Sequence, residues 1–141
     1  MDDLLTSVGY ALAYSAVGIV ILAIGYVALD VLTPGRLGHH IMREGSVNAA
    51  IVTAAGLVGL GFIVFTAIWS NGDSSFGHAL GWTITFGLLG VIMQAVAFRL
   101  LDLFLPDDLA AIVMRKEFHP ASIVAAASQI AVSLVIVACV A

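Results

Sequence analysis

Four charged residues have the types and spacing that could support chemistry, two aspartates and two arginines. They are Asp30, Asp102, Arg43 and Arg115. Each aspartate stands four residues before a proline, Pro34 or Pro106, and an arginine follows in each case. Ionisable residues near a membrane usually pair with one another, so we expect each aspartate to form an ion pair with the arginine that follows it. The functional alternative is a paired polar site that recruits a partner or gates a passage.

Two amide side chains, Gln94 and Gln129, lie within otherwise apolar stretches. Such an amide either hydrogen-bonds to a neighbouring helix, for about 1 kcal/mol, or lines a hydrated path. We favour hydrogen bonds between helices, because the corresponding residues 72 positions earlier are Leu22 and Leu57 and any polar path would be lopsided. No Asp, Glu, Lys or Arg lies deep within these stretches, whereas proton relays, ion pathways and voltage sensors usually have an ionisable residue there.

No pattern typical of an enzyme active site occurs in the chain. There is no Ser-His-Asp order, HExxH, Gly-rich phosphate loop or CxxC. His39 and His40 would diverge by about 100° on a helix, which is poor geometry for one metal ion even with His119 added. Cys139 is the single cysteine. Five basic residues are too few for a nucleic-acid surface. We therefore predict no enzymatic activity, cofactor, metal or nucleic-acid partner.

The chain contains a duplicated unit. Leu29–Ala55 and Leu101–Ala127 align without a gap at an offset of 72 residues. The matched pairs include Leu29/Leu101, Asp30/Asp102, Pro34/Pro106, Leu37/Leu109, Met42/Met114, Arg43/Arg115 and Ala49/Ala121. Self-similarity at a fixed offset indicates a repeated structural unit. We place the two copies at residues 7–69 and 79–141.

The composition is that of a membrane protein. Of the 141 residues, 62% are hydrophobic and only 10% are charged, against about half and a quarter in soluble domains. Four apolar runs are each near the roughly 20 residues that cross a hydrocarbon core of about 30 Å. These runs are about Ser7–Leu29, Val47–Trp69, Ala79–Phe98 and Ala121–Ala141. Because each copy holds two spans, the second copy enters the membrane in the same orientation as the first.

The basic residues predict the orientation. All five Lys and Arg lie in or beside the two long connections, before the second span and before the fourth. The positive-inside rule therefore predicts that these connections are cytoplasmic and that both termini are outside. Trp69 and Trp82 flank the short connection Ser70–His78, which has no Lys or Arg, as interfacial tryptophans would.

Each long connection is predicted to contain a short amphipathic helix on the cytoplasmic face. In the second, Pro106 suits a first helical position, and Arg115 and Lys116 would lie in the last turn, where positive charge favours the helix dipole. The first connection has more glycines, so its helix should be weaker. Asn48 and Pro120 stand at the entries to the second and fourth spans, where we expect helix caps and starts.

Small residues recur at a spacing of four in the second and fourth spans. Ala55-x-x-x-Gly59 and Ala127-x-x-x-Ala131 are typical of membrane helices whose backbones approach closely. Since both copies have this spacing, we expect it to pack the second span against the fourth within one molecule rather than to form a dimerisation face.

The chain resembles the bacterial domain of unknown function 350 family from about Gly9 to Val140. The shared pattern is a duplicated two-span unit, with Asp-x-x-x-Pro ending the first span and an Asn- or Pro-headed, Ala-rich second span. The residues at these positions are Asp30, Pro34, Asn48, Asp102 and Pro106. The resemblance implies a small four-span inner-membrane protein and implies no activity.

The sequence as a whole predicts an all-α integral membrane protein, a four-helix bundle of two parallel two-helix repeats. We expect a non-enzymatic component of the bacterial inner membrane that binds partners or acts as a scaffold. It would lie in the lipid bilayer as a homo-oligomer or with a membrane protein partner. The alternative is a subunit of a small oligomeric channel or permease, with Gln94 and Gln129 lining the path.

Overall fold

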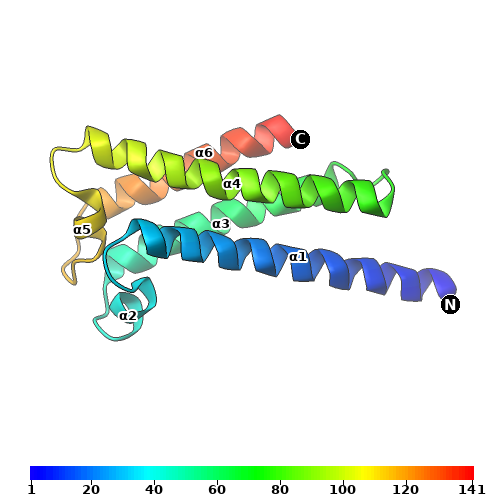
Figure 1. The fold of residues 1–141 in the computed structure, drawn as a ribbon, viewed down its shortest axis with the longest axis horizontal. Helices are drawn as coiled ribbons and strands as arrows, with labels where there is room; N and C mark the ends of the chain where they lie inside the picture. Colours follow the sequence, from blue (N-terminus) through cyan, green and yellow to red (C-terminus); the bar gives the residue numbers. More distant parts are fainter.

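The computed structural model describes residues 1–141, and every regular element is a helix (Figure 1). In chain order the helices are α1 (Asp2–Leu32), α2 (Leu37–Met42), α3 (Val47–Trp69), α4 (Phe76–Phe104), α5 (Leu109–Val113) and α6 (Ala121–Val140). Four of them, α1, α3, α4 and α6, are long and apolar enough to cross a membrane. The predicted all-α fold with four transmembrane helices is therefore confirmed.

The four long helices form one bundle (Figure 1). α1 and α4 run in one direction, and α3 and α6 run in the opposite direction. The loop between α3 and α4 lies at the end that also holds the N-terminus, here called the N-terminal end, and α2 and α5 lie at the other end, here called the α2–α5 end. α3 packs most extensively against α6, and α1 is the least buried of the four.

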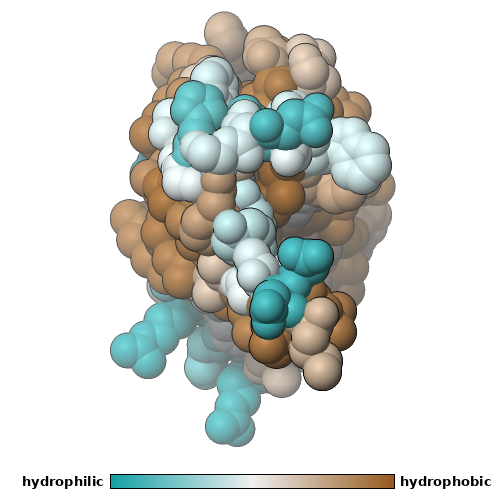
Figure 2. Space-filling model, turned by 90° about the vertical axis from the view of Figure 1, so that its right-hand side faces the viewer, coloured by the Kyte–Doolittle hydropathy of each residue, from teal (hydrophilic) through white to brown (hydrophobic).

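Polar and apolar residues are distributed as a membrane requires. Figure 2 looks at the N-terminal end, where polar residues gather on the end face while hydrophobic residues cover most of the sides. This distribution suits a bundle whose sides meet hydrocarbon and whose ends meet water.

Two spans are longer than the sequence predicted. α3 has the predicted bounds, whereas α1 begins almost at the N-terminus and α4 continues to Phe104. Both of the longer helices end two residues before a proline, so that one non-helical residue stands between the helix and the proline. Thr33 and Leu105 have extended backbones, with ψ of 145° and 144°, because proline disfavours the helical conformation in the residue before it. Pro34 and Pro106 thus turn the chain out of the bundle.

Proline does not begin the short helix α5, contrary to prediction. α5 follows Asp108, whose side chain accepts a hydrogen bond from the backbone N–H of Ala111 at 3.1 Å. Pro106 therefore lies in the preceding turn, and the side chain of Asp108 caps the start of the helix instead. Arg115 and Lys116 lie beyond the end of α5 rather than in its last turn.

The hydrophobic core has two parts. One lies at the α2–α5 end around Phe98 and Leu109, both fully buried, and α5 contributes four of its five residues to it. The other lies around Leu60 and Ile63 and joins α3 to α1, α4 and α6. Because most of α5 is inside the protein, this short helix joins the long helices together at their end.

The predicted packing of the second span against the fourth is confirmed, because α3 packs most extensively against α6, but the predicted small residues of α6 do not make the contact. Gly59 is buried, but Ala127 and Ala131 are exposed on the outside of α6. The buried face of α6 carries Gln129 and Ser133 instead. An amide and a hydroxyl have few partners in hydrocarbon, so the helix turns these groups toward the protein, and Ala127 and Ala131 come to lie outside.

Candidate functional site

Two aspartates make the same contact in the two halves of the chain. The backbone N–H of Leu37 donates to Oδ1 of Asp30 at 2.5 Å, and the N–H of Leu109 donates to Oδ1 of Asp102 at 2.7 Å. These N–H groups belong to the first residues of α2 and α5 and have no partner within their own helices. Each carboxylate thus fixes a short helix to the end of the long helix before it, with the same seven-residue separation.

The predicted ion pairs of Asp30 with Arg43 and of Asp102 with Arg115 are wrong. Both arginines are exposed, and neither lies within ion-pair distance of an aspartate. Only Arg99 approaches a carboxylate, at 3.8 Å from Asp102, and its side chain is more than half exposed. A nearby backbone N–H reaches a carboxylate without ordering a long side chain, whereas an exposed arginine loses rotamer freedom for a weak attraction.

Ser46 and Asn48, at the start of α3, hold the segment between α5 and α6. Ser46 is the N-cap of α3, and its hydroxyl donates to the carbonyl of Arg115 at 2.7 Å. The amide nitrogen of Asn48 donates to the carbonyls of Arg115 and Glu117, at 3.0 and 2.7 Å. Its oxygen accepts from the N–H of His119 at 2.8 Å. Fully buried Asn48 is therefore a bridge between the two halves, and not the helix cap that was predicted.

These hydrogen bonds bring the segment that follows α5 beside the start of α3 at the α2–α5 end. The backbone of residues 115–119 is bound there to Ser46 and Asn48. The exposed side chains of residues 42–46 and 114–118 are here called the loop patch. They are Met42, Arg43, Arg115, Lys116, Glu117 and Phe118.

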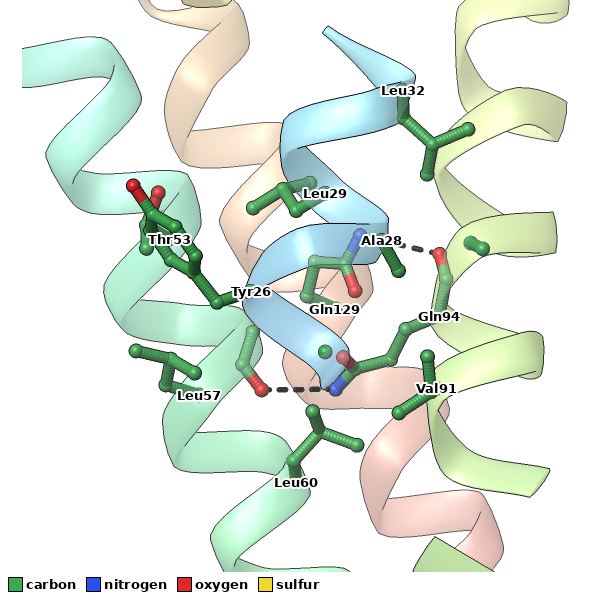
Figure 3. A pocket seen from close by; sticks show the side chains of 13 residues that line it. Tyr26, Ala28, Leu29, Leu32, Thr53, Leu57, Leu60, Val91, Gln94 and Gln129 are labelled. Atoms are coloured by element: carbon green, nitrogen blue, oxygen red, sulfur yellow. Dashed lines mark hydrogen bonds between the residues drawn. The ribbon is translucent and has the colours of Figure 1, made fainter. Parts of the chain in front are cut away.

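The two amides meet inside the bundle (Figure 3). Nε2 of Gln94, on α4, donates to the carbonyl of Gly56 on α3 at 3.1 Å and to the hydroxyl of Ser133 on α6 at 2.7 Å. Nε2 of Gln129, on α6, donates to the backbone carbonyl of Gln94 at 3.3 Å. Both side chains are buried. Together they connect α3, α4 and α6 by hydrogen bonds in the interior of the bundle.

A glycine makes room for this polar cluster. A Cβ atom at Gly59 would collide with the side chain of Ser133 and would lie 2.9 Å from Nε2 of Gln94. In a membrane the surrounding lipid is as apolar as the helices, so close backbone approach and hydrogen bonds hold helices together. Gly59 therefore permits the contact between α3 and α6 at the level of the amides.

Two residues of these networks are absent from the sequence predictions, Ser46 and Ser133. Ser133 follows Gln129 by four residues, a spacing that puts both side chains on one helical face. Ser46 directly precedes an apolar run, which is a helix-start signal. Both signals were present in the sequence. The histidines, cysteine and carboxylates do not gather in any group of three that could hold a metal ion.

Comparison with known proteins gives a consistent set of relatives. A family model described as Domain of Unknown Function (DUF350) matches residues 3–140. A UPF0719 transmembrane protein of Mycolicibacterium paratuberculosis is 35% identical over 127 residues, covering 90% of this chain and 83% of the relative. A UPF0719 transmembrane protein of Mycobacterium bovis is 27% identical over 138 residues, covering 98% of this chain and 90% of the relative. No solved structure matches the chain significantly.

Removing the Asp102 carboxylate should loosen α5 from α4. A hydrogen bond to a charged group contributes about 1.5–3 kcal/mol, so Asp102→Ala should accelerate hydrogen exchange at the N–H of Leu109 by about tenfold or more. The control is Asp107→Ala, which removes an exposed carboxylate from the same turn. Hydrogen exchange read by mass spectrometry in detergent measures both variants. Equal exchange in the two would contradict the role given to Asp102.

Adding one methyl group at Gly59 should separate α3 from α6. Overpacking usually costs about 1–3 kcal/mol, so Gly59→Ala should lower the free energy of unfolding by that amount. Gly61→Ala is the matched control, because it lies in the same helix and its Cβ would meet nothing within 4 Å. That variant should be neutral or more stable by up to about 1 kcal/mol. Unfolding in mixed micelles compares them, and equal destabilisation would refute the assigned contact.

Proposed function

The chain belongs to the family described as Domain of Unknown Function (DUF350), and for this member we propose a non-enzymatic role as a partner-binding or scaffold component of the bacterial inner membrane. The partner is a protein with an acidic surface, bound at the loop patch. The observation that carries this proposal is the presence of exposed arginine, lysine, methionine and phenylalanine side chains on two segments at the same end of the bundle, one of which is hydrogen-bonded to the start of α3.

The cations at the α2–α5 end are free to bind a partner. Four of the five basic residues take part in no ion pair, whereas most carboxylates at this end are engaged within the protein. The unpaired cations are Arg36, Arg43, Arg115 and Lys116. Three aspartates, Asp30, Asp102 and Asp108, accept backbone hydrogen bonds, and Glu44 contacts the rings of two histidines. The unused hydrogen-bonding capacity is thus mainly cationic, which favours an acidic partner.

The apolar members of the loop patch support a protein partner in particular. Met42 is 82% exposed and Phe118 is 53% exposed, each close in sequence to an exposed basic residue. Aromatic residues, methionine and arginine are enriched in protein–protein interfaces relative to the rest of protein surfaces. Since the backbone beneath Arg115 is held by Ser46 and Asn48, little order has to be gained when a partner binds.

We also propose that the α2–α5 end is cytoplasmic and that both termini are outside, because all five basic residues lie toward that end. A channel or permease subunit remains the second candidate. It is less well supported, because the nitrogens of both deep amides bond to neighbouring helices and no Asp, Glu, Lys or Arg lies deep within the spans.

The test is affinity purification from native membranes in mild detergent, with the assembly mass measured. Reversing two charges of the loop patch, Arg115→Glu with Lys116→Glu, should reduce the amount of co-purified partner by about tenfold or more, because like charges would face the acidic surface. The matched control is Arg99→Gln, which removes an exposed cation outside the patch and should leave the partner bound.

Three results would contradict the proposal. One is a protein recovered as a lone monomer, and another is a partner bound equally well by the charge-reversed variant. The third is liposome flux that is unchanged by the charge reversal but lost in Gln94→Leu and Gln129→Leu, which would favour the permease instead. A homo-oligomer whose assembly is lost on charge reversal would identify the partner as a second copy of the chain.

A further inference from the structure

One buried acceptor in the amide cluster has no hydrogen-bond partner within the protein. The Oε1 atom of Gln129 is completely buried and accepts no hydrogen bond. Gln129 lines a small cavity between α1, α3, α4 and α6, together with Gln94 and Thr53 (Figure 3). The remaining wall is mostly apolar and includes Tyr26 and Leu29 of α1.

The network fixes how both amides are oriented. The hydroxyl of Ser133 donates its proton to the backbone carbonyl of Gln129 at 2.7 Å, so it must accept from the side-chain nitrogen of Gln94. The carbonyl of Gly56 can only accept, which requires the same nitrogen. By the same argument, the backbone carbonyl of Gln94 can only accept, so it requires the side-chain nitrogen of Gln129. Turning either amide over would place oxygen against oxygen, so each Oε1 is left to accept a hydrogen bond from elsewhere.

The volume and the lining of the cavity limit the size and the charge of the group that can donate a hydrogen bond to these oxygens. Its volume is about 20 Å³, which suits one water-sized group. The free acceptors of the wall are the amide oxygens of Gln94 and Gln129 and the hydroxyl oxygen of Thr53, which already donates to Ala49. The hydroxyl of Tyr26, also in the wall, can donate or accept. No carboxylate lines the cavity, so a cation would be buried without a counter-charge.

We propose that this cavity is a binding site for one small neutral hydrogen-bond donor, a water molecule bound within the membrane-spanning bundle. The water donates to the side-chain oxygens of Gln129 and Gln94, and so provides a hydrogen-bond donor to the buried Oε1 atom of Gln129, which has none within the protein. Both amides of the site come from the second half of the chain, because the matching residues of the first half are Leu22 and Leu57. It is closed on one side by α1, the least buried long helix. This inference does not depend on the proposed partner.

The test is nuclear magnetic resonance of the full-length protein in lipid nanodiscs, with protonated glutamine side chains in a deuterated background. Cross-relaxation between water and the side-chain amide protons of Gln94 and Gln129 should be present and should have the sign of a long-lived contact. In Gln129→Leu, the water contact of Gln94 should be lost. Thr83→Val is the control, because Thr83 is equally buried and bonds only within α4. That variant should retain the contact.

The wild-type measurement decides the matter even if Gln129→Leu does not fold. Absence of cross-relaxation in the wild-type protein would overturn the proposal, as would its persistence in folded Gln129→Leu. Titration with ¹⁵N-labelled ammonium chloride tests the charge of the occupant. If ammonium protons replaced water in contact with Gln94, the assignment of a neutral donor would be wrong.

Discussion

The close approach of α3 to α6 is the contact on which the rest of the bundle depends. Hydrocarbon offers no gain for burying one apolar helix against another, so packing and hydrogen bonds have to hold the helices together. Gly59 permits the approach, and the amide of Gln94 then reaches both Gly56 and Ser133. α4 is attached to this pair through the same amide. α1 makes no hydrogen bond to the cluster and remains the least buried helix.

The α2–α5 end depends on a different kind of contact, in which side chains bond to backbone groups. Asp30 and Asp102 hold the first N–H groups of the short helices, while Ser46 and Asn48 hold the chain before α6. Such bonds form over short distances and need no long, flexible side chain. As a consequence, the basic side chains are not used for the fold, and the backbone that presents them is held firmly.

The polar groups of the molecule therefore lie mainly in an interior cluster and at the two ends of the bundle. The interior cluster carries no charge and bonds one helix to the next. The surface at the α2–α5 end carries exposed cations together with Met42 and Phe118.

The sequence by itself determined the number of spans and their approximate positions, although α1 and α4 are longer than predicted. Hydrophobic runs of the right length and a proline after α1 and after α4 are local signals, and they act through desolvation and backbone sterics. Only the tertiary structure decided which groups meet. Asp102 bonds to a backbone N–H instead of Arg115, and α6 buries Gln129 and Ser133 instead of Ala127 and Ala131. The physical reason is that lipid and protein interior are both apolar, so hydropathy does not distinguish the face of a helix that packs from the face that meets lipid. Polar side chains and glycines decide that face, and their partners come from helices far apart in the chain.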